Sequence, residues 1–381
     1  MKSGFTLSYW EKVSFLHDID IIIIGSGIVG LTAAIQLKEQ DSRLNVLVLE
    51  RGVLPLGAST RNAGFACFGS MTELMADYEK YGYDQVFALV EQRWRGLHRL
   101  RERLGEATID FKMNGGYEIF TQNNHVAYAQ CRERMGYFND ELFRIIGTPD
   151  TFVLADQKIS ENGLANVNHI IQNQFEGQLH TGKMMRRLLQ IAQSKDVIIL
   201  NGIEVTDIQS HNQGVTLLTN TGWTLDAHKV LVCTNGFARQ LLPRIDVQSA
   251  RNQVLITKPI PNLLLDGCFH YEEGYYYFRN IDNRILLGGG RHLAFATEAV
   301  DDFGTTELIS NALDEILHTI ILPNQHTEVD MRWSGILGLG HSKKPIVEML
   351  TPHLGVAVRM GGMGVALGSL VGEDGANMLL S

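Results

Sequence analysis

The feature that most constrains this chain is a glycine-rich turn near its N-terminus. The turn, GSGIVG over Gly25–Gly30, follows an apolar strand predicted over Ile19–Ile24 and opens an apolar helix predicted over Ile28–Gln40. In this pattern the first glycine makes the tight turn, the second lets the backbone approach a pyrophosphate, and the third lets helix and strand pack closely. The N–H groups and the dipole at the helix start favour bound phosphate. The turn therefore predicts a dinucleotide site.

An acidic residue stands where such a site needs one. A second strand is predicted over Val46–Glu50, and Glu50 lies about twenty residues beyond the turn, where a carboxylate binds the ribose hydroxyls of the adenosine. Arg51 follows, but the carboxylate at the usual position disfavours NADP. Strand, helix and strand with short connections open a parallel sheet and predict an α/β fold. NAD and FAD share the ADP half, so this unit does not distinguish one cofactor from the other. The alternative to dinucleotide binding is a turn whose glycines have only a structural role.

Two further glycine-rich segments favour FAD. GASTRNAG, over Gly57–Gly64, is a loop of small residues whose N–H groups suit a phosphate or ribityl contact, with a solvated turn as the alternative. MGGMGVALG, over Met360–Gly368, leads into a helix to Leu380. N–H groups at that helix start would stabilise the negative charge of a reduced isoalloxazine, although a packing motif reads similarly. We expect both ends of the chain to fold onto one long cofactor.

Composition excludes several other classes of protein. The net charge of −9 and the pI near 5.8 argue against a nucleic-acid partner. The four cysteines lie far apart without a Cys-x-x-Cys pair, so we expect no metal site, no redox dithiol and a reducing compartment. The N-terminus lacks the pattern of a signal peptide, and apolar runs such as Ile21–Ile24 are far too short for a transmembrane segment. We expect a cytoplasmic protein.

The ordered motifs resemble the D-amino-acid-oxidase-like FAD-dependent oxidoreductases, nearest to the gamma-glutamylputrescine oxidoreductase and glycine oxidase branch. The likeness runs from about Ile19 to Leu380. The segments IIIIGSGIVGLTAAIQL and VLVLERG occur in many flavoproteins, but their order together with GASTRNAGF and RWSG is more specific to this family. The matching segments are IIIIGSGIVGLTAAIQL, VLVLERG, GASTRNAGF, KVLVCTNGF, YYYFRNIDNRILLGGG, RWSGILG and MGGMGVALG.

The resemblance implies a Rossmann-like FAD-binding domain with a discontinuous, antiparallel-sheet substrate domain. We expect residues 17–110, 170–243 and 332–381 in the first domain and residues 111–169 and 244–331 in the second. No cysteine or histidine occupies a family attachment point, so the FAD is expected to be non-covalent. The residues expected to bind FAD are Gly25, Ser26, Gly27, Ile28, Val29, Gly30, Glu50, Arg51, Ala58, Ser59, Asn62, Ala63, Gly64, Phe65, Val205, Thr234, Gly236, Gly361, Gly362, Met363, Gly364, Val365, Ala366 and Leu367.

The resemblance also implies the chemistry. Family enzymes oxidise the C–N bond of a small amine or amino acid by hydride transfer to flavin N5, and the imine then hydrolyses. Oxygen or a quinone reoxidises the flavin. The cofactor performs the difficult step, so no acid or base side chain is assigned. The alternatives are an FAD-dependent 2-hydroxy acid dehydrogenase and a flavin-binding module without independent turnover.

The expected substrate residues depart from the family pattern. Amino-acid oxidases of the family hold the substrate carboxylate with arginine, but Leu337 and about Gly364 stand at those positions here. The loss of these arginines fits a substrate amine without an adjacent carboxylate. Alternatively, Arg291 or Arg332 supplies the positive charge that binds a carboxylate.

Aromatic, histidine and lysine side chains also lie near the expected site. Tyr275 matches a substrate-facing position and, as alternate strand residues, Tyr275 and Tyr277 share a face that can hold a cationic amine; a plain aromatic core is the alternative. His270, His292 and His341 are expected to be structural, and Lys343 to lie in a solvated loop.

Overall fold

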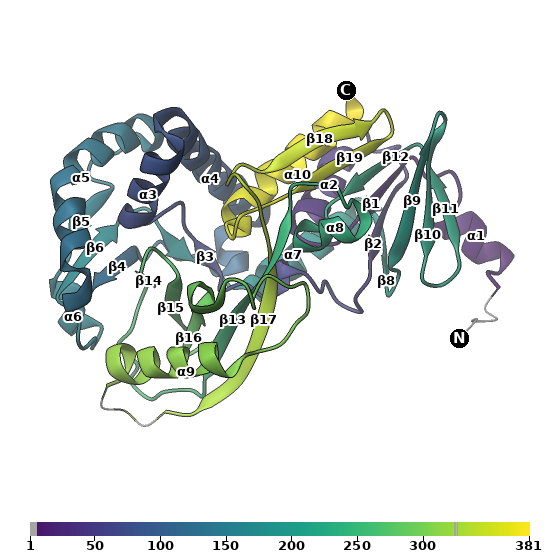
Figure 1. The fold of residues 1–381 in the computed structure, drawn as a ribbon. Helices are drawn as coiled ribbons and strands as arrows, with labels where there is room; N and C mark the ends of the chain where they lie inside the picture. Colours follow the sequence, from purple (N-terminus) through teal and green to yellow (C-terminus); the bar gives the residue numbers. More distant parts are fainter. Residues whose placement is uncertain (1–5, 324, 326) are drawn as a thin grey trace.

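The computed structural model describes residues 6–323, 325 and 327–381 and contains two large sheets (Figure 1). The first sheet has six strands in the order β18-β19-β12-β1-β2-β8, all parallel to their neighbours except β18. Its strands read as short apolar runs because both faces are covered. They are β1 (Ile21–Ile24), β2 (Val46–Glu50), β8 (Ile198–Asn201), β12 (Lys229–Val232), β18 (Ile346–Thr351) and β19 (Leu354–Val358).

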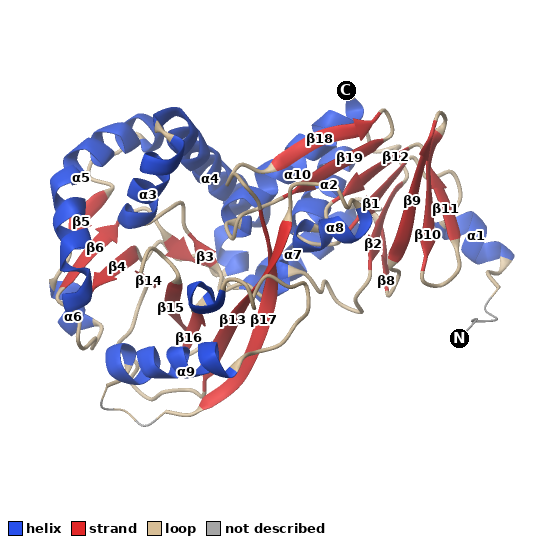
Figure 2. Cartoon of the chain, in the orientation of Figure 1, coloured by secondary structure: helices blue, strands red, loops and turns tan. Residues whose placement is uncertain are grey.

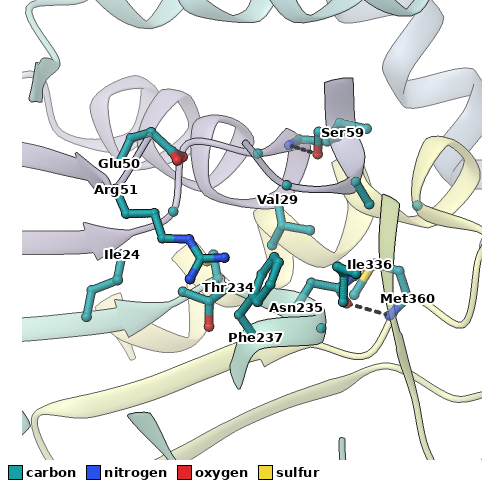
Figure 3. A pocket seen from close by; sticks show the side chains of 18 of the residues that line it. Ile24, Val29, Glu50, Arg51, Ser59, Thr234, Asn235, Phe237, Ile336 and Met360 are labelled. Carbon is teal, nitrogen blue, oxygen red and sulfur yellow. Dashed lines mark hydrogen bonds between the residues drawn. The ribbon is translucent and has the colours of Figure 1, made fainter. Parts of the chain in front are cut away.

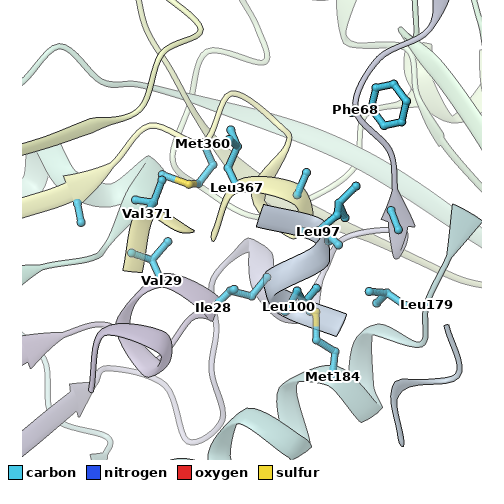
Figure 4. Close-up of a cluster of buried hydrophobic side chains, with 14 of the residues drawn as sticks. Ile28, Val29, Phe68, Leu97, Leu100, Leu179, Met184, Met360, Leu367 and Val371 are labelled. Carbon is cyan, nitrogen blue, oxygen red and sulfur yellow. The ribbon is translucent and has the colours of Figure 1, made fainter. Parts of the chain in front are cut away.

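Helices cover one face of this sheet. Helix α2 (Ile28–Gln40) packs against α10 (Gly364–Leu380) and α7 (Thr181–Ser194), and α10 packs in turn on α4 (Tyr83–Leu104). Figure 4 shows Ile28 of α2 among Leu97, Met184 and Leu367 of these helices. The other face packs on a three-stranded antiparallel sheet, seen at the right of Figure 1, made of β9 (Val205–His211), β10 (Gly214–Thr219) and β11 (Thr224–Ala227).

The second large sheet has eight strands in the order β17-β13-β16-β15-β14-β4-β6-β5 (Figure 2). Its pairs are antiparallel except β14 with β4. Helix α9 (Glu307–Ile316) packs on one of its faces. The strands are β4 (Gly116–Phe120), β5 (Phe152–Leu154), β6 (His169–Asn173), β13 (Gln248–Thr257), β14 (Cys268–Tyr271), β15 (Tyr276–Ile281), β16 (Arg284–Gly289) and β17 (Val329–Leu339).

Shorter elements complete the fold. A two-stranded antiparallel ribbon pairs β3 (Phe65–Ala66) with β7 (Gly177–Gln178) beside the large sheets. The remaining helices and single turns are α1 (Tyr9–Phe15), η1 (Ala58–Thr60), α3 (Met71–Tyr81), η2 (Glu106–Ile109), η3 (Gln122–Asn124), α5 (His125–Ile146), α6 (Gln157–Glu161), η4 (Asn235–Phe237), α8 (Ala238–Leu241), η5 (Arg291–Ala294) and η6 (Leu317–Ile321).

The expected fold class is confirmed: a mixed α/β chain has a Rossmann-like parallel sheet and a separate, largely antiparallel sheet. The predicted helix over Ile28–Gln40 and strand over Val46–Glu50 agree with the observed bounds. The predicted domain boundary at residue 332 falls inside β17, and the domain division stays a prediction. Among the described residues, no helix combines the length and apolarity needed to cross a bilayer.

Two glycine-to-alanine substitutions should shift stability in opposite directions. A Cβ on Gly30 would overlap the carbonyl oxygen of Gly25, whereas a Cβ on Gly136, in the exposed middle of α5, meets nothing within 4 Å. We expect Gly30→Ala to destabilise the fold by about 1–3 kcal/mol through overpacking. Gly136→Ala should stabilise it by about 0.5–1 kcal/mol because alanine loses less backbone entropy in a helix. Thermal unfolding followed by circular dichroism measures both; a Gly30→Ala protein as stable as the wild type contradicts this reading.

Candidate functional site

A cavity of about 500 Å³ opens where the glycine turn, the small-residue loop and the C-terminal turn meet (Figure 3). It lies beyond the ends of β1, β2 and β12, at the carboxyl edge of the parallel sheet, where α/β folds place their ligands. The structure therefore brings three separated segments to one site. The sequence-predicted residues that line it are Gly25, Gly27, Ile28, Val29, Glu50, Arg51, Ala58, Ser59, Asn62, Val205, Thr234, Gly236, Leu337, Gly362, Gly364 and Val365.

The small-residue loop is fastened directly to the glycine turn. The Ser59 hydroxyl accepts a hydrogen bond of 3.0 Å from the backbone N–H of Ile28, the first residue of α2. A Cβ on Gly27 would lie only 2.8 Å from that hydroxyl, so glycine is needed for this approach. Asn62 holds the loop in shape: its side-chain amide donates to the Ser59 carbonyl oxygen at 2.9 Å and accepts from Gly64 N–H at 2.8 Å.

Glu50 is a buried carboxylate at the end of β2 with both oxygens in use. One oxygen accepts from the Ser26 N–H at 3.1 Å and from the Ser26 hydroxyl at 2.8 Å. The other accepts from the Gly52 N–H at 2.9 Å. These donors fix the orientation of the carboxylate, which lines the cavity as an acceptor suited to ribose hydroxyls. Ser26 does not line the cavity but fixes the carboxylate that does.

The C-terminal turn reaches the cavity through Asn235, which follows β12. The Asn235 side-chain oxygen accepts from the backbone N–H groups of Arg359 and Met360 at 3.1 and 3.2 Å, and Figure 3 shows the second contact. Gly361 N–H adds a hydrogen bond to the Gly338 carbonyl oxygen at 3.1 Å. These bonds place the start of α10 at the cavity wall.

The residues present fit an extended dinucleotide. Helix α2 begins at the N-cap Gly27 and α10 at the N-cap Met363, and neither N-cap side chain bonds its own helix. Both helix starts therefore offer N–H groups and positive dipole ends to a bound anion. The Thr234 hydroxyl, in the cavity lining, is buried without a hydrogen-bond partner in the described chain. Buried polar atoms of this kind are normally satisfied, here by a ligand.

Comparison with known proteins decides between the dinucleotides. The model of the DAO family, described as "FAD dependent oxidoreductase", matches residues 20–378. The chain belongs to this family of FAD-dependent oxidoreductases. Gamma-glutamylputrescine oxidoreductase of Escherichia coli is 24% identical to it, over 94% of this chain and 83% of that protein.

Solved structures of similar fold agree with the family. Glycine oxidase from Geobacillus kaustophilus superposes with a TM-score of 0.75 and 22% identity, covering 96% of this chain and 95% of that chain. L-proline dehydrogenase from P. horikoshii has the same TM-score at 17% identity and covers 95% and 93%. The predicted family is confirmed and FAD is the cofactor of this oxidoreductase.

The end of the cavity near Glu50 contains a stack that the sequence did not reveal. The Arg51 guanidinium lies 3.9 Å from the ring centre of Phe237 and donates to the side-chain oxygen of Gln240 at 3.1 Å. Figure 3 shows Arg51 and Phe237 side by side in the cavity. Phe237 belongs to the quoted motif KVLVCTNGF, but nothing in the motif indicates that its ring faces Arg51. Cys233 also lines the cavity, and burial raises the pKa of its thiol, so it stays protonated beside non-covalent FAD.

Part of the predicted FAD set lies behind the cavity wall. These residues support the wall, and their direct contact with FAD remains a prediction. Ala366 and Leu367, for example, are buried in the helix core, and Phe65 packs against Tyr277. The residues outside the lining are Ser26, Gly30, Ala63, Gly64, Phe65, Gly361, Met363, Ala366 and Leu367.

Of the predicted substrate residues, Leu337 lines the cavity and the two tyrosines do not. Tyr275 precedes β15, so strand alternation does not extend to it; its ring lies 4.8 Å from that of His292. Tyr277 lies within β15, where its hydroxyl accepts from the Asn252 amide at 3.0 Å. Burial raises the pKa of Tyr277, which keeps the phenol neutral.

Arg291 and Arg332, the two arginines that could bind a substrate carboxylate in place of the family's arginines, differ in whether they already have an acceptor. Arg332 already donates to both carboxylate oxygens of Asp314, at 2.6 and 2.7 Å. Arg291 instead lies over the Phe295 ring at 4.6 Å and has no hydrogen-bond acceptor within the described part of the chain. Arg291 is therefore the better placed of the two to bind an anion.

Lys343 does not lie in a solvated loop as the sequence suggested. Its ammonium donates to Glu73 at 3.0 Å and to Asp77 at 2.7 Å, both on α3. Burial alone would lower the pKa of Lys343, but these carboxylates raise it above its usual value. The ammonium is thus committed to an ion-pair network, which ties the loop before β18 to α3.

Replacing Glu50 by glutamine should weaken FAD binding. The change removes the negative charge and leaves an amide donor facing the Ser26 and Gly52 N–H groups. Loss of charged hydrogen bonds of about 1.5–3 kcal/mol predicts a Kd for FAD raised by about 10- to 100-fold. Glu204→Gln is the matched control, since Glu204 lines the same cavity but is half exposed and approaches Arg51 only at 3.9 Å. Fluorescence titration of the apoprotein with FAD measures both; equal affinities in the two variants contradict the role of Glu50.

Proposed function

We propose that this protein oxidises the C–N bond of a small amine or amino acid. The observation that carries the proposal is that Leu337 and the N-termini of α2 and α10 line one and the same cavity. Leu337 stands where amino-acid oxidases of the family have an arginine that binds the substrate carboxylate. Gamma-glutamylputrescine oxidoreductase, glycine oxidase and L-proline dehydrogenase, by their names, all act on amines or amino acids. A common fold and cofactor site support the same class of reaction here, with hydride transfer from the donor carbon and hydrolysis of the imine product.

The chain's own contribution is orientation and electrostatics. FAD, when bound, supplies the two-electron acceptor. The N–H groups at the start of α10 lie where they favour added negative charge on a ligand. The apolar Leu337 side chain limits water at the same wall, and a substrate held against it has fewer orientations open to it. No acid or base side chain is assigned, because a neutral amine needs none.

The absence of arginine at Leu337 bears on the substrate. Arg51, at the adenosine end of the cavity, stacks on Phe237 and is not placed for a substrate carboxylate. Arg291, near Tyr275 and without a hydrogen-bond acceptor, is the residue we assign to a carboxylate where the substrate carries one. The unpaired, separated cysteines are consistent with a cytoplasmic location, which forms part of the proposal.

An anaerobic screen tests the reaction. The purified holoprotein is mixed with amines, amino acids and 2-hydroxy acids, and loss of flavin colour is followed. We expect bleaching by a member of the amine or amino-acid set, followed by release of ammonia or a smaller amine. Bleaching by hydroxy acids alone would establish the 2-hydroxy acid dehydrogenase instead. No bleaching by any of the three sets would favour a flavin-binding module. Adding oxygen or a quinone to the bleached protein identifies the electron acceptor.

Substitution of Arg291 tests how a carboxylate is bound. For a substrate with a carboxylate, Arg291→Met should raise the concentration for half-maximal flavin reduction by about 10- to 100-fold, since a charged hydrogen bond is worth roughly 1.5–3 kcal/mol. Arg291→Lys keeps the positive charge but loses the planar guanidinium group. Its half-maximal concentration should therefore lie between those of the wild type and Arg291→Met. An amine without a carboxylate should be unaffected. A carboxylate substrate equally insensitive to Arg291→Met would disprove the assignment.

A further inference from the structure

A buried cluster of metal-ligating side chains lies outside the FAD cavity, on the far side of Phe65. Donor atoms of Cys67, Glu176 and His270 lie within 4.8 Å of one another. Cys67 and Glu176 are fully buried or nearly so, and the His270 side chain is 13% exposed. The His270 ring contacts the Phe65 ring edge-on, with centres 5.4 Å apart. None of these three residues is used by the proposed oxidation.

Sheet geometry explains why the three side chains converge. In the ribbon of β3 and β7, Phe65 pairs with Gln178 and Ala66 with Gly177. Cys67 directly follows β3 and Glu176 directly precedes β7, so both lie at the same end of the ribbon. His270 comes from the neighbouring strand β14 of the eight-stranded sheet. On the adjoining strand β4, a Cβ on Gly116 would overlap the Glu176 carboxylate, so glycine leaves the room that the carboxylate occupies. Two sheets therefore supply the donors.

Glu176 is oriented and yet incompletely satisfied. One carboxylate oxygen accepts from the N–H groups of Phe68 and Gly69 at 2.8 and 2.9 Å. The other oxygen forms a long ion pair of 3.4 Å with Nε2 of His270, and among the described residues neither of these two atoms makes a hydrogen bond. A fully buried carboxylate oxygen without a donor is costly. A cation bound between these two ligand atoms would satisfy both of them.

The distances and charges fit one kind of cation. Zinc bonds of about 2.0–2.3 Å in a tetrahedral arrangement separate ligand atoms by roughly 3.3–3.8 Å. The 3.4 Å between Nε2 of His270 and the Glu176 oxygen falls in this range, and all three ligand atoms lie within 4.8 Å of one another. One thiolate and one carboxylate neutralise a divalent cation, and a neutral imidazole adds no charge, so the buried site would carry no net charge. Sulfur, nitrogen and oxygen together favour a borderline-soft metal over magnesium or calcium. The partly exposed His270 ring gives an entry path.

From this geometry we infer that Cys67, Glu176 and His270 form a zinc site with three protein ligands that joins the β3–β7 ribbon to the eight-stranded sheet. The fourth position is open to water; the neighbouring Cys268 thiol instead donates to the Gly177 carbonyl oxygen at 3.1 Å. Zinc binding displaces the Cys67 thiol proton to solvent, and no electron transfer is involved. The site braces Phe65 at the end of the FAD-binding loop.

Metal analysis of the holoprotein tests this site independently of the oxidation. Protein from zinc-supplemented cells should carry zinc in a one-to-one ratio, and removal by a chelator should lower the thermal unfolding midpoint. Cobalt should replace the zinc and give its visible absorption at longer wavelength than the flavin bands. Cys67→Ala and His270→Gln should lose the metal, with folding checked by bound FAD. His270→Gln keeps an amide donor for Glu176.

Cys131→Ala is the matched control, because Cys131 is a buried cysteine of helix α5 away from the cluster. It should keep wild-type zinc. Wild-type protein that neither contains zinc nor takes it up on titration would overturn the inference, as would equal zinc contents in Cys67→Ala and Cys131→Ala. In that outcome Glu176 and His270 form only a buried ion pair. FAD content and flavin bleaching are measured separately, so failure of the metal site leaves the oxidation proposal standing.

Discussion

The close packing of α10 on α2 is the contact on which the cofactor site depends. A Cβ on Gly368 would lie 2.7 Å from the Ile28 side chain, and a Cβ on Gly372 would lie 2.6 Å from the Val29 carbonyl oxygen. The first turn of α2 therefore packs against the second and third turns of α10, and the N-termini of both helices open at the same end of the pair. Because each N-terminus concentrates free N–H groups, the two ends of the chain can bind one long anionic ligand.

Much of the cofactor site could be predicted from sequence because its determinants are local. The tight turn at Gly25, the helix that follows it and the carboxylate of Glu50 depend on neighbours within one strand–helix–strand unit. The unit needs no long-range information to be recognised. The glycine-rich segments predict that this unit meets the turn around Gly362, and the cavity lining is consistent with this expectation.

What the sequence could not provide are contacts made between distant segments. The stack of Arg51 on Phe237 joins the residue after β2 to the 3-10 turn η4, and Lys343 pairs with carboxylates on a helix far away in sequence. Widely spaced cysteines predict no metal site, and this remains a prediction; the fold nevertheless brings the Cys67 thiol close to the His270 ring. Spacing along a chain detects a metal site only when its ligands share one loop or hairpin. Ligands on separate sheets leave no such pattern.

The buried carboxylates around α3 show why Glu176 stands apart. Burial alone would raise the pKa of Glu73, but the charges of Lys343 and Arg93 lower it to about 2. Glu118 is held by the hydroxyl and N–H of Thr72, and burial still raises its pKa, so a proton can complete its neutralisation. Each of these groups has its compensation within the chain. Glu176 has it on one oxygen only, and its other oxygen lies 3.4 Å from Nε2 of the His270 imidazole and close to the Cys67 thiol, two side chains that can also bind a metal. The fold has thus left one buried charge to be balanced by something other than a lysine or an arginine.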